Sequence, residues 1–352
     1  MNPKDIIEEL ISIVIREGGS DLHISSGRHP SIRVSSQLLF LENQAILSND
    51  DMLKILKQVL GQERTDRFLK DQEADFSWSS ASGMRLRGNA FVHKGSLAMA
   101  FRLIPKVRTL AELNLPPALE IFARKKQGFF LVVGPVGHGK STTLAAMVDM
   151  INRERTEHII TIEDPIEYIF DPDKSIIDQR EVGIDTRDFE SALQSSFRQD
   201  VNVIMIGEMR SPATMAAAVT AAETGHLVLS TLHTNNASQT IDRIIDSFPS
   251  GQQDQIRIQL AGSLLGIFSQ RLVPRAVGGL VPAYELLVNN NAVSNLIRER
   301  RTHEIDVVIE TGFELGMVDM NRSLLELMRK GDVTMENAML HSLNPKALEK
   351  FS

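Results

Sequence analysis

The sequence predicts an α/β protein of two domains, a small α+β domain followed by a larger domain with a mainly parallel sheet. The chain has 352 residues, 42% of them hydrophobic, which suffices for about two domains of roughly 150 residues with buried cores. The pattern of the chain changes near Pro105. Before this residue, strands and helices occur in separate runs, which favours an α+β domain. After it, short apolar strands alternate with longer helices, which favours a parallel sheet covered on both faces.

Residues 1–105 form the first predicted domain. It opens with an amphipathic helix in which Ile7, Leu10 and Val14 share one side and acidic residues lie between them. The other predicted elements are a helix at about 50–60 and strands at 22–24, 32–34, 85–91 and 97–103. Residues 106–117, which include two consecutive prolines, continue neither a helix nor a central strand and predict a hinge linker.

Residues 118–352 form the second predicted domain, whose most informative motif follows its first strand, 129–133. Residues 134–141 fit the pattern Gly-x-x-x-x-Gly-Lys-Ser/Thr, and residues 142–151 have helical spacing. Glycines let backbone N–H groups turn around a polyphosphate, while the lysine reaches the terminal phosphates and the serine can ligate Mg²⁺. The motif therefore predicts a site for a nucleoside triphosphate. Its residues are Gly134, Pro135, Val136, Gly137, His138, Gly139, Lys140 and Ser141.

Acidic residues follow two further predicted strands. Strand 159–162 runs into Glu163, and strand 203–206 runs into Gly207 and Glu208. In open α/β sheets, the carboxyl ends of the strands border the crevice where ligands bind. Either glutamate could orient a water, and either could hold Mg²⁺ directly or through water. The alternative is that both are solvated strand ends.

Two histidines flank a third predicted strand, 227–232, which follows an Ala-rich helix that ends near Gly225. His226 precedes this strand and His233 follows it. A histidine beside a strand is more often a hydrogen-bonded packing residue. At the end of a strand in a nucleotide-binding fold, however, an imidazole such as that of His233 could contact the terminal phosphate.

Composition excludes several classes of function. The chain has 38 Lys and Arg against 45 Asp and Glu, a net charge of -7, which disfavours nucleic acid as a partner. Cysteine is absent, which excludes a disulfide framework and a thiolate zinc site. Apolar runs fall far short of the roughly 20 residues of a transmembrane helix, and the N-terminal helix does not resemble a signal peptide. We therefore expect a cytoplasmic protein, at most peripheral to a membrane.

Four ordered motifs resemble those of the secretion-superfamily ATPases, and most closely those of the PilT-like type IV pilus retraction ATPases. They are residues 134–142 (Walker A), 161–167 (Asp box), 207–210 (Walker B) and 222–234 (His box). The resemblance extends over nearly the whole chain. It implies a PAS-like N-terminal domain, a RecA-like P-loop ATPase domain with a helical C-terminal region, and a homo-hexameric ring that binds ATP between the domains.

The resemblance also implies roles for individual residues. Lys140, Ser141 and Thr142 would hold phosphate and Mg²⁺, Glu208 would be the catalytic carboxylate, and Glu163 would help to position water and metal. The implied histidine sensors are His226 and His233.

Basic residues of the first domain reach the phosphates in this family, and Arg87 and Arg102 occupy the matching positions. A guanidinium suits this role because its planar fork spans phosphate oxygens and stays charged. The alternative is that both arginines form salt bridges on a strand face. Further candidates, for subunit contacts, are Arg198 and Arg210.

The chain departs from the family pattern at several positions. Ser294 replaces an arginine of the C-terminal signature, and Asn202 stands where the family has an aspartate. In the P-loop, Val136 replaces a threonine and His138 replaces a small residue. We expect His138 to point to solvent; a protonated His138 near the phosphates, which would tighten binding, is the alternative.

The leading interpretation is a hexameric ATPase motor that drives type IV pilus retraction through the platform protein at the cytoplasmic face of the inner membrane. The absence of cysteine favours this type, because assembly and type II secretion ATPases usually carry a four-cysteine insert. One alternative is an accessory pilus or type II secretion ATPase that works with a second pilus ATPase. Another is a nucleotide-gated regulatory module with little turnover.

Overall fold

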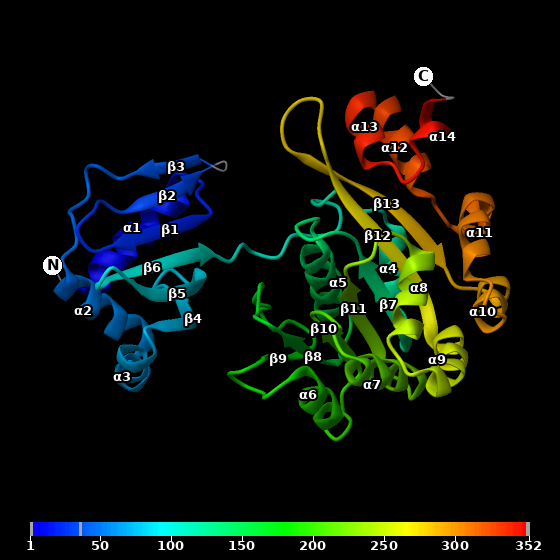
Figure 1. Cartoon of the computed structure of the whole chain (residues 1–352), viewed down its shortest axis with the longest axis horizontal. Coiled ribbons are helices and arrows are strands. Elements are labelled where there is room, and N and C mark those ends of the chain that lie inside the picture. The colour runs from blue at the N-terminus through cyan, green and yellow to red at the C-terminus, as the bar shows by residue number, and fades with distance from the viewer. Residues whose placement is uncertain (1–2, 35–36, 350–352) are drawn as a thin grey trace. The chain divides into compact units, whose positions relative to one another are not determined.

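A computed structural model describes residues 3–34 and 37–349, and the chain divides into two compact units (Figure 1). The first unit runs to Lys106 and includes the short segment Glu167–Ile169, and the second comprises the remainder. Residues 104–109 between the regular elements of the two units form neither helix nor strand. The hinge role of residues 106–117, and the domain limits 1–105 and 118–352, stay predictions.

The first unit is an antiparallel sheet with helices packed on one face. In the described residues its strands lie in the order β3-β2-β1-β6-β5-β4. The strands are β1 (Asp21–Ser25), β2 (Ser31–Val34), β3 (Gln37–Phe40), β4 (Glu73–Ser79), β5 (Arg85–His93) and β6 (Ser96–Leu103). The helices are α1 (Pro3–Arg16), α2 (Asn49–Leu60) and α3 (Gln62–Asp71).

Side-chain alternation gives this sheet two different faces. Leu22 and Phe101 are buried in one core with Ile7 of α1 and Leu56 of α2. Intervening residues such as His23 point to the opposite face, because successive side chains of a strand alternate. The helices therefore cover one face of the sheet, and the side chains on the other face, His23 among them, are not covered by these helices.

The predicted helices and strands of this unit are present, and three elements were not predicted. Strand β3 has all four of its residues exposed, and helix α3 buries only Thr65 and Phe68. Strand β4 alternates weakly between buried and exposed residues. The two strands escaped prediction because neither alternates clearly between apolar and polar residues. Helix α3 escaped because Phe68 and Leu69 are its only apolar residues.

The second unit is a mainly parallel sheet in the order β13-β12-β7-β11-β10-β8-β9, in which only β13 runs antiparallel to its neighbour. The strands are β7 (Gly128–Val133), β8 (His158–Glu163), β9 (Ile176–Glu181), β10 (Val203–Ile206), β11 (Leu227–Leu232), β12 (Leu264–Pro274) and β13 (Leu280–Val288). The central strand β7 is buried along its whole length. Such continuous apolar strands are typical of parallel sheets covered on both faces.

Helices cover both faces of this sheet. The helices are α4 (Ala118–Ala123), α5 (Lys140–Glu154), α6 (Phe189–Ser196), α7 (Pro212–Glu223), α8 (Ala237–Asp246), α9 (Ser250–Ser263), α10 (Asn291–Arg298), α11 (Ile305–Thr311), α12 (Met320–Arg329), α13 (Met335–His341) and α14 (Pro345–Glu349). Phe129 and Leu131 of β7 pack in one core with α7 and α9. Phe130 points the other way and stacks on Phe122 of α4, with ring centroids 4.4 Å apart. The predicted α/β fold class is therefore confirmed.

The C-terminal region is helical, as predicted. Val273 of β12 and Val281 of β13 form a separate small core with Leu324 of α12. Within the described ranges 3–34 and 37–349, no helix is both long and apolar enough to cross a membrane.

Strand β13 carries a buried carboxyl group that makes stability depend on pH. Glu285 is 5% exposed and accepts hydrogen bonds from the Ala237 backbone N–H (2.8 Å) and the Ser269 hydroxyl (3.0 Å). Burial raises its pKa from 4.5 to about 7. Because the folded chain holds this proton more tightly than the unfolded chain, the group favours folding below pH 4.5, and this advantage is lost as pH rises to about 7.

Glu285→Gln should therefore raise the free energy of unfolding at about pH 8, by on the order of 3 kcal/mol, and much less at about pH 5. The amide keeps the oxygen that accepts both hydrogen bonds and cannot ionise. Urea denaturation at the two pH values measures the effect, with the exposed Glu336→Gln as control. An equal effect at both values would contradict the shifted pKa.

Candidate functional site

The predicted phosphate loop joins β7 to α5 and requires glycine at its first position. Gly134 has a φ of +146°, and a Cβ placed there would lie 2.3 Å from the backbone carbonyl oxygen of Gln270. Gly139, immediately before α5, is in the left-handed region at a φ of +80°. The loop therefore follows a path that side chains at these positions would obstruct.

Gln270 of β12 braces this loop from behind. It is 3% exposed, donates a hydrogen bond to the carbonyl oxygen of His138 (2.9 Å) and accepts one from the hydroxyl of Thr143 (2.6 Å). The side chain thus ties the loop to the first turn of α5. Sequence analysis missed Gln270 because it is distant in sequence and belongs to no motif; its neighbours in β12, Ser269 and Arg271, are polar as well, so the amide does not stand out.

His138 does not point to solvent, contrary to the prediction. Its Nδ1 accepts a hydrogen bond from the backbone N–H of Leu272 at 2.9 Å, and the side chain is half-buried. Partial burial lowers the pKa of His138 below its usual 6.5, helped by the nearby charges of His341, Arg271 and Lys140. The neutral ring therefore fastens the loop to β12, because a ring nitrogen that accepts a hydrogen bond carries no proton.

Lys140, His233 and Glu208 form a continuous row beside the loop. The Lys140 ammonium donates hydrogen bonds to the carbonyl oxygens of Gly134 and Pro135, each at 2.9 Å, and lies 3.1 Å from His233 Nδ1. The other ring nitrogen, Nε2, lies 3.6 Å from Glu208 Oε2. Lys140 begins α5 after the loop that follows β7, whereas His233 and Glu208 follow the carboxyl ends of β11 and β10. These three strands are neighbours in the sheet.

The two predicted carboxylates differ in their surroundings. Glu208 has a side chain that is 16% exposed and pairs with Arg210. Glu163 is 6% exposed and accepts hydrogen bonds from the Thr161 hydroxyl (2.6 Å) and the Gln179 amide (3.2 Å). Glu208 is thus the more accessible carboxylate, whereas Glu163 is held in a fixed orientation.

The remaining residues of the loop and of the first turn of α5 are mostly accessible to solvent. Gly137 has a φ of +79° with open space around it, and Val136 is 79% exposed. Ser141 is exposed on the first turn of α5, and Thr142 after it is half-buried. The oxygen ligands that Ser141, Glu163 and Glu208 offer are of the kind that Mg²⁺ prefers.

His226 lies at the other end of its strand, so the structure does not bring it into the row. It immediately precedes β11, donates through Nδ1 to the carbonyl oxygen of Ala221 (3.0 Å) and packs against Phe197. His233 follows the same strand of six residues, which at a rise of roughly 3.3 Å per residue places the two histidines about 20 Å apart. Within one chain, His226 is a packing residue.

The other predicted basic residues lie outside the loop. Arg102 and Arg87 are cross-strand neighbours on the sheet of the first unit, and Arg102 donates to Asp21 at 2.8 Å. Arg198 is exposed after α6, whereas Arg210 pairs with Glu208.

Position 294 is a packing position in this chain. The buried Ser294 hydroxyl donates to the carbonyl oxygen of Ala261 at 2.8 Å. Two arginines that follow the signature pair with neighbours, Arg300 with Asp254 and Arg301 with Glu304.

Comparisons with known proteins agree with this architecture. Residues 111–305 match the family described as "Type II/IV secretion system protein". The chain is 40% identical to the type IV pilus retraction ATPase PilT of Pseudomonas aeruginosa, over 94% of this chain and 96% of that protein. It is also 40% identical to the type IV pilus ATPase PilU of the same organism, over 95% and 88%.

The fold is similar to a crystal structure of the pilus retraction motor PilT with bound ADP, at a TM-score of 0.92 and 43% identity, over 98% of this chain and 99% of that one. The match covers both the antiparallel and the parallel sheet. With its phosphate loop, its row of lysine, histidine and carboxylate, and these relatives, the chain belongs to the type II/IV secretion system protein family.

Proposed function

We propose that this protein is a motor that hydrolyses ATP to ADP and phosphate and uses the energy to retract type IV pili. The row of Lys140, His233 and Glu208 along the phosphate loop carries the proposal. It places a cation for phosphate and a carboxylate for water on either side of one imidazole. The names of the relatives, PilT above all, supply the pilus and the direction of movement.

Each group of the site has a defined task in this proposal. The backbone N–H groups of residues 134–140 and the N-terminus of α5 would hold the phosphates, with Lys140 on the terminal ones. Ser141 and Glu163 would bind Mg²⁺, which would neutralise developing charge on the phosphates when bound. Glu208 would accept a proton from the attacking water, and His233 would respond to the terminal phosphate.

Arg87 and Arg102 would complete the site from the first unit of the same or a neighbouring chain. Both side chains lie on one face of the first sheet, because directly paired residues of an antiparallel sheet point the same way. The Arg102 side chain is 71% exposed although it contacts Asp21, so its guanidinium is accessible to a phosphate. In a homo-hexamer, phosphate release would then remove contacts that hold two domains together, and the domains would rotate about a hinge at residues 106–117.

The names of the relatives supply a pilus as the structure on which the motor acts, and its other partners are part of the proposal. We propose that it works at the cytoplasmic face of the inner membrane on a pilus platform protein. A second candidate function is that of an accessory pilus ATPase, favoured by the equal identity to PilU. A nucleotide-gated regulatory module with little turnover is the remaining alternative.

Two experiments separate these functions. The purified ring should release phosphate from ATP in the presence of Mg²⁺, and negligible release would support the regulatory module instead. A deletion strain should carry excess pili that do not retract. Retraction that persists at reduced force or frequency would instead support the accessory role, and pili that are absent would indicate assembly.

The fastening of the loop by His138 is also testable. His138→Ala should weaken ATP binding by roughly fivefold, because it removes one hydrogen bond that holds the loop. His138→Asn should restore most of the affinity, since Asn Oδ1 occupies the place of Nδ1 and can accept from Leu272 N–H. Titration calorimetry with a non-hydrolysable ATP analogue measures both variants. Equal weakening in both would show that the hydrogen bond does not matter.

A further inference from the structure

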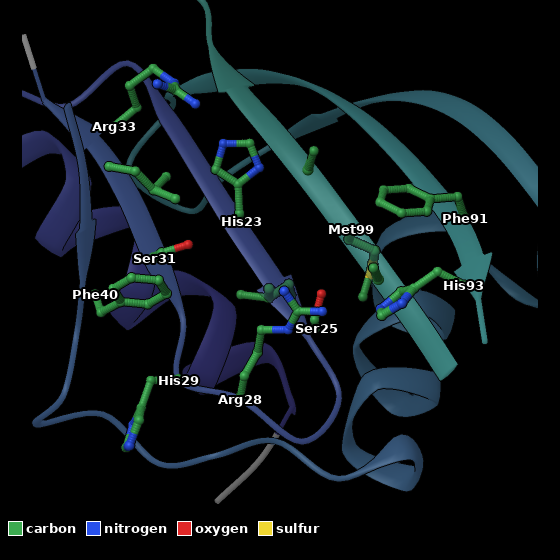
Figure 2. Close-up of a pocket in the computed structure, with 14 residues that line it drawn as sticks. His23, Ser25, Arg28, His29, Ser31, Arg33, Phe40, Phe91, His93 and Met99 are labelled. Atoms are coloured by element: carbon green, nitrogen blue, oxygen red, sulfur yellow. The ribbon is translucent and has the colours of Figure 1, made fainter. Parts of the chain in front are cut away.

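A cavity lies on the sheet of the first unit, and none of the residues of the phosphate loop, 134–141, line it (Figure 2). Its volume is about 410 Å³, which is within the range of small-molecule sites. It opens on the face that alternates with the core under α1 and α2, since His23 and Ser25 line it while Leu22 belongs to the core. Strands β1, β2, β3, β5 and β6 contribute to it.

Small side chains create the hollow. Ser31 on β2 is paired with His23 on β1, which is paired with Ala100 on β6, and Ser25 is paired with Ala98. Because directly paired residues point to the same side of the sheet, the two serines and two alanines form a low floor. Larger residues at these positions would fill the space.

Aromatic rings border this floor on two sides. Phe40 of edge strand β3 is 60% exposed and Phe91 of β5 is 37% exposed. Figure 2 shows the two rings on opposite sides of the hollow, with β1 and β6 between them. Exposed phenyl faces of this kind are stacking surfaces for planar heterocycles.

The polar lining is cationic or neutral. The cavity is lined by Arg28, Arg33, His23, His29 and His93, and none of the described lining residues is acidic. Figure 2 shows the Arg28 side chain reaching from the β1–β2 connection toward Ser25.

Two histidines of this lining have ring nitrogens without a partner. The Nε2 atoms of His23 and His93 are buried and make no hydrogen bond to any described residue. His29, by contrast, donates through Nδ1 to the carbonyl oxygen of Gln44 at 2.8 Å. Buried polar atoms in native proteins are nearly always satisfied, so these two nitrogens mark a lining whose polar groups the described residues leave unpaired.

We propose that this cavity binds a nucleotide other than the one at the phosphate loop. The phosphate of a nucleoside monophosphate would lie on the Arg28 guanidinium, where charge-assisted hydrogen bonds are strongest. Its base would stack on the exposed ring of Phe40 or Phe91. The proposal does not depend on ATP hydrolysis, since no loop residue takes part.

Binding can be tested in the full chain with the loop disabled by Lys140→Ala. Titration calorimetry with AMP and with GMP should give affinities at least about tenfold higher than inorganic phosphate or adenosine alone, because only the nucleotide engages both arginine and ring. Adding Arg28→Ala should weaken binding by about tenfold. The matched control is Arg67→Ala, since Arg67 lies exposed on α3 with a side chain that is 84% exposed.

A second measurement locates the ligand without altering the loop. Ala98 lies on the floor of the cavity, so its ¹³C-labelled methyl signal should shift on addition of AMP or GMP to the unmodified chain, and Ala100→Leu, which fills the floor, should abolish the shift. Absence of any shift, affinity unaffected by Arg28→Ala, or phosphate binding as tight as nucleotide binding would each overturn the proposal.

Discussion

The Glu208→Gln chain is expected to bind ATP within about threefold of the unmodified affinity and to hydrolyse it at least about 100-fold more slowly. The amide keeps the size of the side chain but cannot accept the proton of an attacking water. Lys140 and the loop, which would hold the phosphates, are unchanged. Single-turnover hydrolysis and analogue binding, measured on the same preparation, separate the two effects.

The control for this variant is Glu190→Gln. Glu190 is an exposed carboxylate of α6 that contacts Gln194 and lies outside the four motifs, so its neutralisation should leave kcat and binding unchanged. Turnover by Glu208→Gln at the normal rate would remove Glu208 from the mechanism. A parallel Glu163→Gln variant distinguishes the two carboxylates, since a metal-positioning residue should respond to higher Mg²⁺ concentration.

Gly134→Ala should abolish measurable nucleotide binding, an effect of at least about 100-fold. The new methyl carbon would lie 2.3 Å from the carbonyl oxygen of Gln270, which is backbone and cannot rotate away. Either the loop or β12 must move, and a displaced loop carries with it the backbone N–H groups proposed to bind the phosphates. Analogue binding and the thermal midpoint should both fall.

Gly183→Ala serves as the matched control because it separates backbone strain from collision. Gly183 has a φ of +82° with nothing within 4 Å of an added Cβ, so alanine there costs only about 1 kcal/mol of strain. Binding should survive in this variant. If Gly134→Ala were to bind nucleotide normally, contact between the loop and β12 would not shape the site.

Local pattern was sufficient to predict the parts of the site that lie within single motifs. The glycines of the loop, Lys140 and the carboxylates at strand ends could be located because a strand, a turn and a helix follow each other without interruption. Gln270 could not be predicted, since its contacts with Thr143 and His138 join residues 127 and 132 positions apart. Tertiary hydrogen bonds of that kind leave no periodic signal.

The two histidines illustrate a second limit of sequence analysis. His226 and His233 are only seven residues apart in the sequence, yet strand β11 between them places them at opposite ends of that strand. His138 was expected at the surface because nothing in the motif indicated that β12 would lie behind it. The length of one strand, which the sequence predicted, separates the two histidines. The placement of β12 beside the loop, which the sequence does not state, decided the outcome for His138.

One consequence follows from the position of the Lys140 ammonium group. It donates hydrogen bonds to two carbonyl oxygens and lies 3.1 Å from His233 Nδ1. These contacts use its three N–H donors, so it cannot also bind an incoming phosphate without losing one of them. Binding of a nucleotide must therefore break the contact between Lys140 and His233, after which the His233 ring is free to rotate. The orientation of His233 would then report that a nucleotide occupies the loop, before either domain has moved.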